Sequence, residues 1–169
     1  MTSVAKSQPS KKLDDREDLI AENRKARFDY HILETFEAGL VLLGTEVKAM
    51  REGRANLRDS FCRIENGEAF LLNSHIGQYS SGGYASHDPL RTKKLLLHIE
   101  ELRKLIGKTT EKGMTIVPLR MYFKHGRAKC EIALAKGKKS YDKRETIKRR
   151  EAERETRSAV KSSGRSRDN

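Results

Sequence analysis

The stretch "VPLRMYFKHGRAKCEIALA", residues 117–135, decides the fold. Apolar side chains occupy every second position from Val117 to Phe123 and again from Cys130 to Leu134. Such alternation is typical of two β-strands that each present one apolar face. His125-Gly126 separates the two runs and supplies the glycine that a tight turn favours. The sequence therefore predicts a long β-hairpin whose first strand turns its odd-numbered side chains to the core.

Shorter elements precede this hairpin. Asn66-Gly67 divides residues 60–73 into two apolar runs and predicts a second hairpin, because a type I′ turn needs positive φ at both central positions. Residues 28–43, which start at Phe28, alternate like an extended segment. A short helix is expected at 45–53, because Thr45 can cap its start and Gly53 can end it.

Residues 92–107, "TKKLLLHIEELRKLIG", predict the best helix of the chain. Four apolar side chains fall on one helical stripe, namely Leu95, Ile99, Leu102 and Ile106. Arg91, Lys93 and Lys94 would crowd its first turn, where the helix dipole already carries positive charge. Backbone N–H groups and these cations would together form a phosphate site. A plain solvated helix start is the alternative.

These elements amount to five or six short antiparallel strands, one long helix and one short helix. The most economical fold is mainly β: a small, OB-like antiparallel β-barrel with flanking α-helices. A split α+β sheet is the alternative. Residues 21–135 would form this core, residues 1–20 a disordered N-terminal extension, and residues 136–169 a basic C-terminal tail.

The net charge of the 169-residue chain is +12, and it is unevenly distributed. Residues 1–20 sum to zero, residues 21–135 to +5 and residues 136–169 to +7. Such a basic excess favours an anionic partner, most often nucleic acid. Cys62 and Cys130 have no disulfide or metal-ligand spacing, and no apolar run is long enough to span a membrane. We therefore expect a soluble, cytoplasmic protein with reduced thiols.

The tail contains the segment "KGKKSYDKRETIKRREAER", residues 136–154. Asp142 and Glu145 have capping-box spacing, and Glu145–Arg149 is a favourable i,i+4 pair, so a helix is plausible. It has no apolar stripe with which to dock on the barrel or insert into lipid. The tail is then either permanently disordered or a helix that forms inside an anionic host, with its cations facing RNA all round.

Signals for catalysis are weak. The chain has no P-loop, no nucleophile motif and no histidine or cysteine pair at metal-ligand spacing, so we expect neither an enzyme nor a cofactor. Scattered residues such as Glu37, His75 and Asp88 leave a nuclease as an alternative. The stretch "NRKARF", residues 23–28, joins three cations to an aromatic ring that could stack on a base. The alternative places Phe28 in the core.

Four stretches, taken in this order, resemble the small protein B family, also called SsrA-binding protein. They are "NRKARFDY" (23–30), "FEAGLVLLGTEVKAMREGRANLRDSF" (36–61), "HDPLRTKKLLL" (87–97) and "GMTIVPLRMYFKHGRAKCEIALAKGKKSYDKR" (113–144). The resemblance implies an OB-like barrel that binds the tRNA-like domain of transfer-messenger RNA (tmRNA). It also implies delivery of tmRNA to stalled ribosomes for trans-translation, in which the protein stands in for the missing anticodon stem. An elongation-factor GTPase would be a further partner. A ribosomal or single-strand RNA-binding OB protein without rescue activity is the alternative.

The resemblance also implies site residues. In the core, the RNA contacts would be Asn23, Arg24, Lys25, Arg27, Phe28, Glu37, Leu96 and Lys129, beside Arg91, Lys93 and Lys94 from the helix start. In the tail, which would occupy the empty mRNA channel, they would be Gly137, Lys138, Lys139, Tyr141, Asp142, Lys143 and Arg144, followed by the cations Lys148, Arg149 and Arg150. Phe28 departs from the family, which usually has histidine there. Residues 1–20 match nothing in the family.

Overall fold

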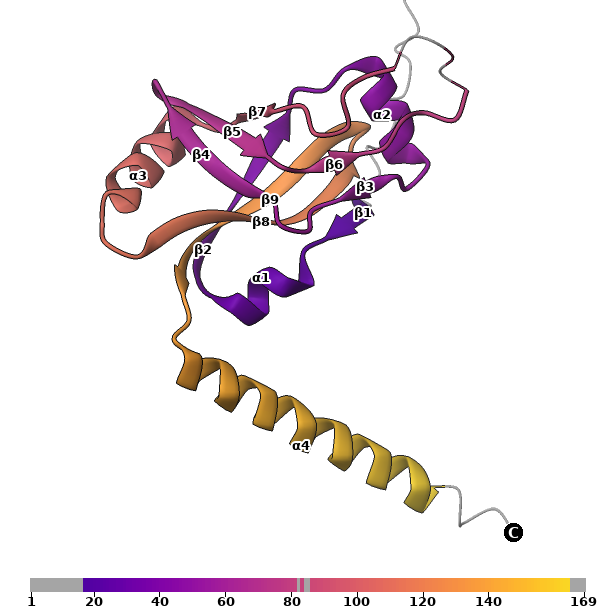
Figure 1. Cartoon of the computed structure of the whole chain (residues 1–169), viewed down its shortest axis with the longest axis vertical. Helices are drawn as coiled ribbons and strands as arrows, with labels where there is room; N and C mark the ends of the chain where they lie inside the picture. Colours follow the sequence, from indigo (N-terminus) through magenta and orange to yellow (C-terminus); the bar gives the residue numbers. More distant parts are fainter. Residues whose placement is uncertain (1–16, 82, 84–85, 165–169) are drawn as a thin grey trace, which may run out of the picture.

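The computed structural model describes residues 17–81, 83 and 86–164. Its strands are β1 (Glu17–Glu22), β2 (Tyr30–Leu40), β3 (Ala55–Asn56), β4 (Phe61–Glu65), β5 (Glu68–Leu72), β6 (His75–Ile76), β7 (Lys93–Leu96), β8 (Met114–Lys124) and β9 (Arg127–Gly137). Its helices are α1 (Arg24–Asp29), α2 (Gly44–Arg51), α3 (Ile99–Thr109) and α4 (Ser140–Gly164). Figure 1 shows a β-rich body with the long helix α4 projecting from it.

The strands close into a barrel. They follow the order β8-β4-β5-β7-β2-β9, every pair is antiparallel, and β9 pairs back onto β8. β1 pairs with the C-terminal half of β8, with Leu19 opposite Tyr122. The short strands β3 and β6 form a separate two-stranded sheet. The prediction of an OB-like antiparallel β-barrel with flanking helices is confirmed.

β8 and β9 pair as one long antiparallel hairpin in the barrel wall, as the alternation predicts. Both predicted turns are confirmed, since φ is +50° and +73° at Asn66-Gly67 and +51° and +72° at His125-Gly126. The prediction that one face of β8 holds all its odd-numbered apolar residues is wrong. A register shift between Pro118 and Arg120 reverses the alternation. The odd-numbered side chains before the shift pack beneath α1, whereas those after it fill the barrel.

The segment predicted as one long helix is instead a strand followed by a helix. β7 covers Lys93–Leu96 and pairs with β5 and β2, and α3 begins only at Ile99. Leu95 is buried in the barrel, whereas Leu96 and Ile99 are exposed, so the four predicted stripe residues do not share one face. Backbone pairing with two neighbouring strands outweighs the local helical pattern. Both partner strands are distant in the sequence, so residues 92–107 alone do not reveal this pairing.

The N-terminal boundary also differs from the prediction. Residues 17–20, expected to be disordered, belong to β1, while residues 1–16 lie outside the described part of the chain. Phe28, expected in an extended segment, lies in α1. Asn23 caps this helix: its side-chain oxygen accepts the Ala26 N–H, and its amide donates to the Pro118 carbonyl over 3.1 Å. α2 is present as predicted, but Glu46 and not Thr45 satisfies its start, by accepting the Leu43 N–H.

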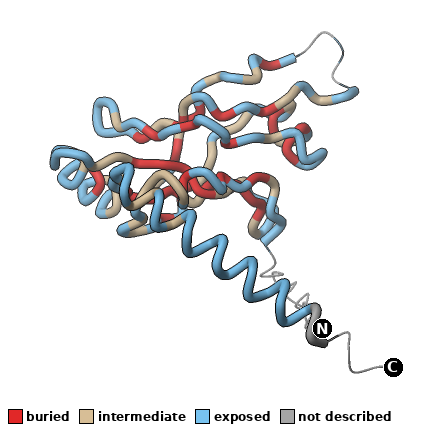
Figure 2. Tube along the Cα trace, turned by 60° about the horizontal axis from the view of Figure 1, so that its bottom comes forward, coloured by how far each residue is buried: buried red, intermediate tan, exposed pale blue. Residues whose placement is uncertain are grey.

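Cys62 and Cys130 are free and buried in the core, the location expected from the sequence. α4 contrasts with this core, because all but a few residues near its start are exposed as far as Lys161 (Figure 2). The structure shows the predicted helix from Ser140 onward; that it forms only on ribosome binding stays a prediction. Among the described residues, no helix combines the length and apolar composition that a membrane span requires.

Candidate nucleic-acid interface

A cleft of about 460 Å³ opens where β2 ends, between β7, β9 and α2. Glu37, Leu96 and Lys129, which are distant in the sequence, all line it. β2 and β9 bring the first and last of these together, since Glu37 lies opposite Glu131 and Gly39 opposite Lys129. We call this the cleft surface. The structure therefore assembles three of the residues that the resemblance implies as RNA contacts.

Glu37 organises the charges of the cleft surface. Its carboxylate accepts a hydrogen bond from the Tyr122 hydroxyl over 2.6 Å and lies 3.3 Å from the ammonium groups of both Lys124 and Lys129. The Tyr122 hydrogen bond lowers the pKa of Glu37, and the two lysines lower it further against the opposing effect of burial. Glu37 therefore stays ionised at neutral pH and holds two cations in place. Tyr122 and Lys124 were not among the predicted site residues.

Leu96 supplies an apolar group beside these charges. Its side chain is 53% exposed and lies over Gly39, its partner on β2. A Cβ at position 39 would come within 3.3 Å of the Leu96 Cβ, so glycine leaves the room that this packing needs. An exposed aliphatic group flanked by lysines suits the apolar faces of a sugar and base next to phosphates.

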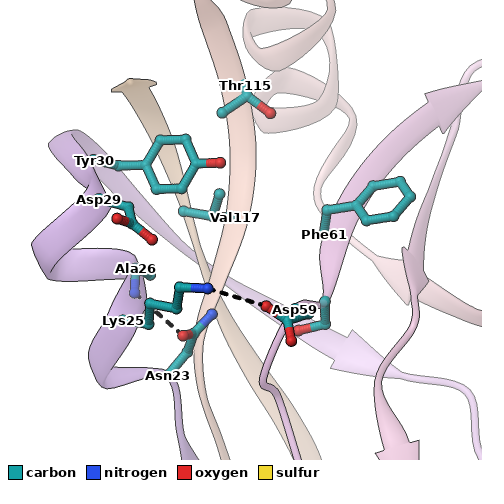
Figure 3. A pocket seen from close by; sticks show the side chains of 10 residues that line it. Asn23, Lys25, Ala26, Asp29, Tyr30, Asp59, Phe61, Thr115 and Val117 are labelled. Atoms are coloured by element: carbon teal, nitrogen blue, oxygen red, sulfur yellow. Dashed lines mark hydrogen bonds and ion pairs between the residues drawn. The ribbon is translucent and has the colours of Figure 1, made fainter. Parts of the chain in front are cut away.

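A second group of predicted residues lies around α1. The side chains of Arg24, Lys25 and Arg27 are exposed, with Arg24 3.2 Å from Glu22 and Lys25 3.3 Å from Asp59. The Lys25–Asp59 pair spans a cleft of about 440 Å³ between α1 and β4 (Figure 3). Surface pairs of this kind are weak, so these cations can exchange their partners for phosphates at little cost. The Asn23 side chain, in contrast, is buried and bonded at both ends, which gives it a structural role.

The tail docks on α1 and the start of β2, contrary to the expectation that it has no means of docking on the barrel. The Asp29 carbonyl accepts the Lys138 N–H over 2.9 Å, and the Asp29 carboxylate lies 3.1 Å from the Lys143 ammonium group. The Arg150 guanidinium lies 5.5 Å from the centre of the Phe28 ring. His31 lies 3.4 Å from Asp142. We call Phe28, Asp29 and His31 the tail seat; it uses ion pairs and a cation–π contact where an apolar stripe is missing.

The seat changes the interpretation of two tail and core residues. Phe28, predicted to stack on RNA or to enter the core, is partly exposed under Arg150. Asp142, predicted at the N-cap, lies in the first turn of α4, and its carboxylate accepts the Lys139 N–H over 3.3 Å. Tyr141, the residue before it, is 59% exposed, so its ring is accessible for stacking on an RNA base. Further along, Arg149 lies 3.9 Å from Glu153, an i,i+4 pair.

The two groups of predicted core residues do not lie together. Tyr30 pairs with Gly137 at one end of the β2–β9 ladder, and Gly39 pairs with Lys129 at the other. Nine residues of strand separate these ends, or about 30 Å at 3.3 Å per residue. The molecule therefore presents two polar surfaces at opposite ends of one ladder: the cleft surface, and the α1 region with the tail.

The phosphate site predicted at Arg91, Lys93 and Lys94 is not formed, because no helix starts there. Lys93 is fully buried and donates to the carbonyls of Ser74 and Arg91 over 2.9 and 2.8 Å, and its burial lowers its pKa. Arg91 binds the fully buried carboxylate of Glu46 with two hydrogen bonds, of 3.0 and 2.6 Å. Lys94 pairs with Glu68. These cations stabilise the fold. Sequence reasoning missed Glu46; the only feature that could have indicated its burial is its position as an acid close to the apolar residues 40–43.

Within the described ranges, no three His, Cys, Asp or Glu side chains are placed to hold a metal ion. His87, the first residue of one family-like stretch, is buried, and its ring nitrogens contact the Thr45 hydroxyl at 2.9 Å and the Ile76 carbonyl at 3.0 Å. The site is thus a set of cations, one ordering carboxylate and exposed apolar groups. That combination is typical of RNA surfaces.

Comparison with known proteins agrees with this geometry. The SsrA-binding protein of Trichodesmium erythraeum (strain IMS101) is 56% identical over 153 residues, 90% of this chain and 98% of the relative. That of Geobacillus thermodenitrificans (strain NG80-2) is 61% identical over 137 residues, 81% of this chain and 88% of the relative. A solved structure described as "tmRNA-SmpB: a journey to the center of the bacterial ribosome" contains a chain that is 54% identical, with a TM-score of 0.60 over 70% of this chain and 84% of that one. The SmpB protein family matches residues 20–162, and the chain belongs to it.

Proposed function

We infer that this protein is an SsrA-binding protein, which binds the tRNA-like domain of tmRNA and delivers it to stalled ribosomes for trans-translation. Its similarity to SsrA-binding proteins and to a chain of a tmRNA–SmpB structure supports this function. The observation that carries the mechanism is the placement of two cationic surfaces at opposite ends of the β2–β9 ladder. Such a molecule can hold one RNA at each end. It acts by binding, without catalysis, in the cytoplasm.

The cleft surface is the proposed site for the tRNA-like domain. Lys124 and Lys129 would reach phosphates, while Glu37 fixes their positions through the contacts described above. Leu96 would pack on a sugar or base face at the edge of the cleft. These groups recognise a folded backbone and not a base sequence, as expected for an RNA that is identified by its shape.

The opposite end is the proposed ribosome-facing surface. Gly137, Lys138 and Lys139 lead from β9 into α4, and the tail would enter the empty mRNA channel, with Tyr141 and Lys143 to Arg144 near the decoding RNA. Because Arg24, Lys25 and Arg27 lie beside the tail and far from the cleft surface, we assign them to this end. The barrel would occupy the place of the missing anticodon stem. An elongation-factor GTPase is the proposed partner during delivery.

We expect replacement of Lys129 by Gln to weaken tmRNA binding several-fold and to reduce the slope of log K against log[salt] by about one. The physical reason is the loss of one ordered cation from the cleft surface. Titration of labelled tmRNA with the protein at several salt concentrations measures both quantities. Lys112→Gln, at an exposed turn before β8, is the matched control and should change neither. Equal losses in the two variants would show that the cleft surface has no special role.

Sequencing the RNA that co-purifies with the protein from its native cytoplasm tests the proposed function directly. A preparation enriched in one tmRNA species supports it. A mixture of ribosomal or single-stranded RNAs without tmRNA enrichment would instead identify a general RNA-binding OB protein. Incubation of the recovered RNA with the protein and Mg²⁺ should leave it intact, whereas cleavage would identify a nuclease.

A further inference from the structure

The cations of α4 gather on one face of the helix. Five of its eight Lys and Arg residues are separated by seven, four, three and four positions, namely Lys143, Arg150, Arg154, Arg157 and Lys161. At 3.6 residues per turn, this spacing places them within about 40° of one line along the helix. Ile147 fills the gap between the first two. We call these five cations the basic stripe.

The acidic residues of α4 all lie off this line. They are Asp142, Glu145, Glu151, Glu153 and Glu155. The remaining three cations are mixed with them around the rest of the helix, so that part carries a net charge of −2 from the eight groups. Cations that face RNA all round were expected from the sequence, whereas the distribution of charge gives α4 one strongly basic face and one mildly acidic remainder.

The tail seat holds the helix by this same face. Lys143 and Arg150, two turns apart on the basic stripe, contact Asp29 and Phe28 respectively. A helix held at two points along one line cannot rotate freely about its own axis. The seat therefore sets the direction in which the rest of the stripe points. Arg154, Arg157 and Lys161 continue the stripe along α4 and are exposed.

We propose that the outer part of the basic stripe, Arg154, Arg157 and Lys161, binds a single RNA backbone lengthwise, while the acidic remainder of α4 faces away from RNA. This rests on the proposed function, in which the tail meets small-subunit ribosomal RNA. A helix surrounded by RNA on all sides would place five carboxylates against phosphates, and like charges in contact repel. A backbone along one side avoids this and still contacts the three outer members of the stripe, Arg154, Arg157 and Lys161, over about 10 Å. Counterion release from that backbone supplies the free energy.

A charge exchange within the full-length protein tests the stripe at constant composition. Arg154→Glu with Glu155→Arg moves one cation off the stripe and places an acid on it. Lys148→Glu with Glu155→Lys exchanges charges between two positions that both lie off the stripe, and serves as the matched control. Each exchange places a cation at position 155, four residues after Glu151, and so gains one favourable i,i+4 pair. Circular dichroism should give the same helix content for both.

Binding to purified small ribosomal subunits, measured at several salt concentrations, is the readout. We expect the stripe exchange to lower affinity about tenfold and to reduce the salt slope by one to two, because two charges change on the phosphate-facing side. The control exchange should change neither. Equal effects of the two exchanges, or none from either, would show that the tail acts as an unoriented polycation. Lower affinity with an unchanged slope would show that the stripe meets something other than phosphate.

A different result would contradict the proposed function. If the subunits bind a tailless protein as tightly as the whole one, the tail has no ribosomal role and the proposed function is wrong at that end. If loss of the tail abolishes binding but the stripe exchange has no effect, the function stands and the stripe is overturned.

Discussion

A chain that ends at Lys136 should bind tmRNA with nearly the affinity of the whole protein and yet fail to support peptide tagging on stalled ribosomes. The residues that line the cleft surface come from positions 37–47, 96–98 and 127–129, so none lies beyond the cut. The barrel loses only the last pair of the β2–β9 ladder, Tyr30 opposite Gly137. The second attachment is lost completely, and linked binding surfaces commonly gain about 10²- to 10⁴-fold from acting together.

Two assays separate these effects. Titration of labelled tmRNA reports the cleft surface, and tagging of a peptide on ribosomes stalled at the end of a truncated message reports both ends. A chain that starts at Glu17 is the control, because it removes the polar residues 1–16 and keeps both the cleft surface and the tail. If the chain ending at Lys136 also loses tmRNA binding, the assignment of one RNA to each end of the ladder is wrong.

Replacement of Glu46 by Ala should reduce the free energy of unfolding by about 3–5 kcal/mol, the typical cost of breaking a buried ion pair from one side. The Glu46 carboxylate is fully buried. It accepts two hydrogen bonds from Arg91 and one from the Leu43 N–H at the start of α2. Its removal takes the carboxylate partner from Arg91 and from the Leu43 N–H, and deprives buried Lys93 of a nearby anion. Glu46→Gln keeps the volume and some hydrogen bonds, so its loss should be smaller. Denaturant unfolding at neutral pH measures both variants.

The same carboxylate makes stability depend on pH. Hydrogen bonds from Arg91 and Leu43 lower the pKa of Glu46 below its ordinary value of 4.5 despite the opposing effect of burial. A carboxyl group whose pKa is lower in the folded state stabilises the fold above its unfolded pKa and loses this contribution as pH falls through the folded pKa. The wild-type protein should therefore lose stability below about pH 4.5 more steeply than Glu46→Gln. Parallel curves for the two proteins would contradict the assignment.

Local pattern sufficed where one strand pair and its turn decide the structure. The β4–β5 and β8–β9 hairpins follow from alternation and from turn residues that tolerate positive φ. The pattern failed at residues 93–96, where a helical spacing of leucines coincides with a strand that two distant neighbours complete. It failed again at Pro118–Arg120, because a bulge shifts every later side chain to the opposite face and leaves no local trace.

The candidate site divides in the same way. The resemblance identified Glu37, Leu96 and Lys129, which the structure brings into one cleft. It could not indicate that Arg24 and Lys25 lie at the far end of the ladder, because their distance from Lys129 depends on strand register. Nor could it indicate that Lys93 is buried, since a lysine in a basic segment resembles a surface group until the strand that carries it is known.

The junction between barrel and tail has a mechanical consequence. β9 ends at Gly137 and α4 starts at Ser140, so only two residues separate a closed barrel from a rod of 25 residues. At 1.5 Å per residue the rod is about 37 Å long, and a tilt of about 10° at its base moves the tip by about 6 Å. A displacement of that size exceeds the spacing of about 4.8 Å between neighbouring strands and would move the tip away from its contacts. α4 therefore behaves as a lever whose direction is set at the tail seat. A small shift of Phe28 or Asp29 should produce a larger displacement of Lys161.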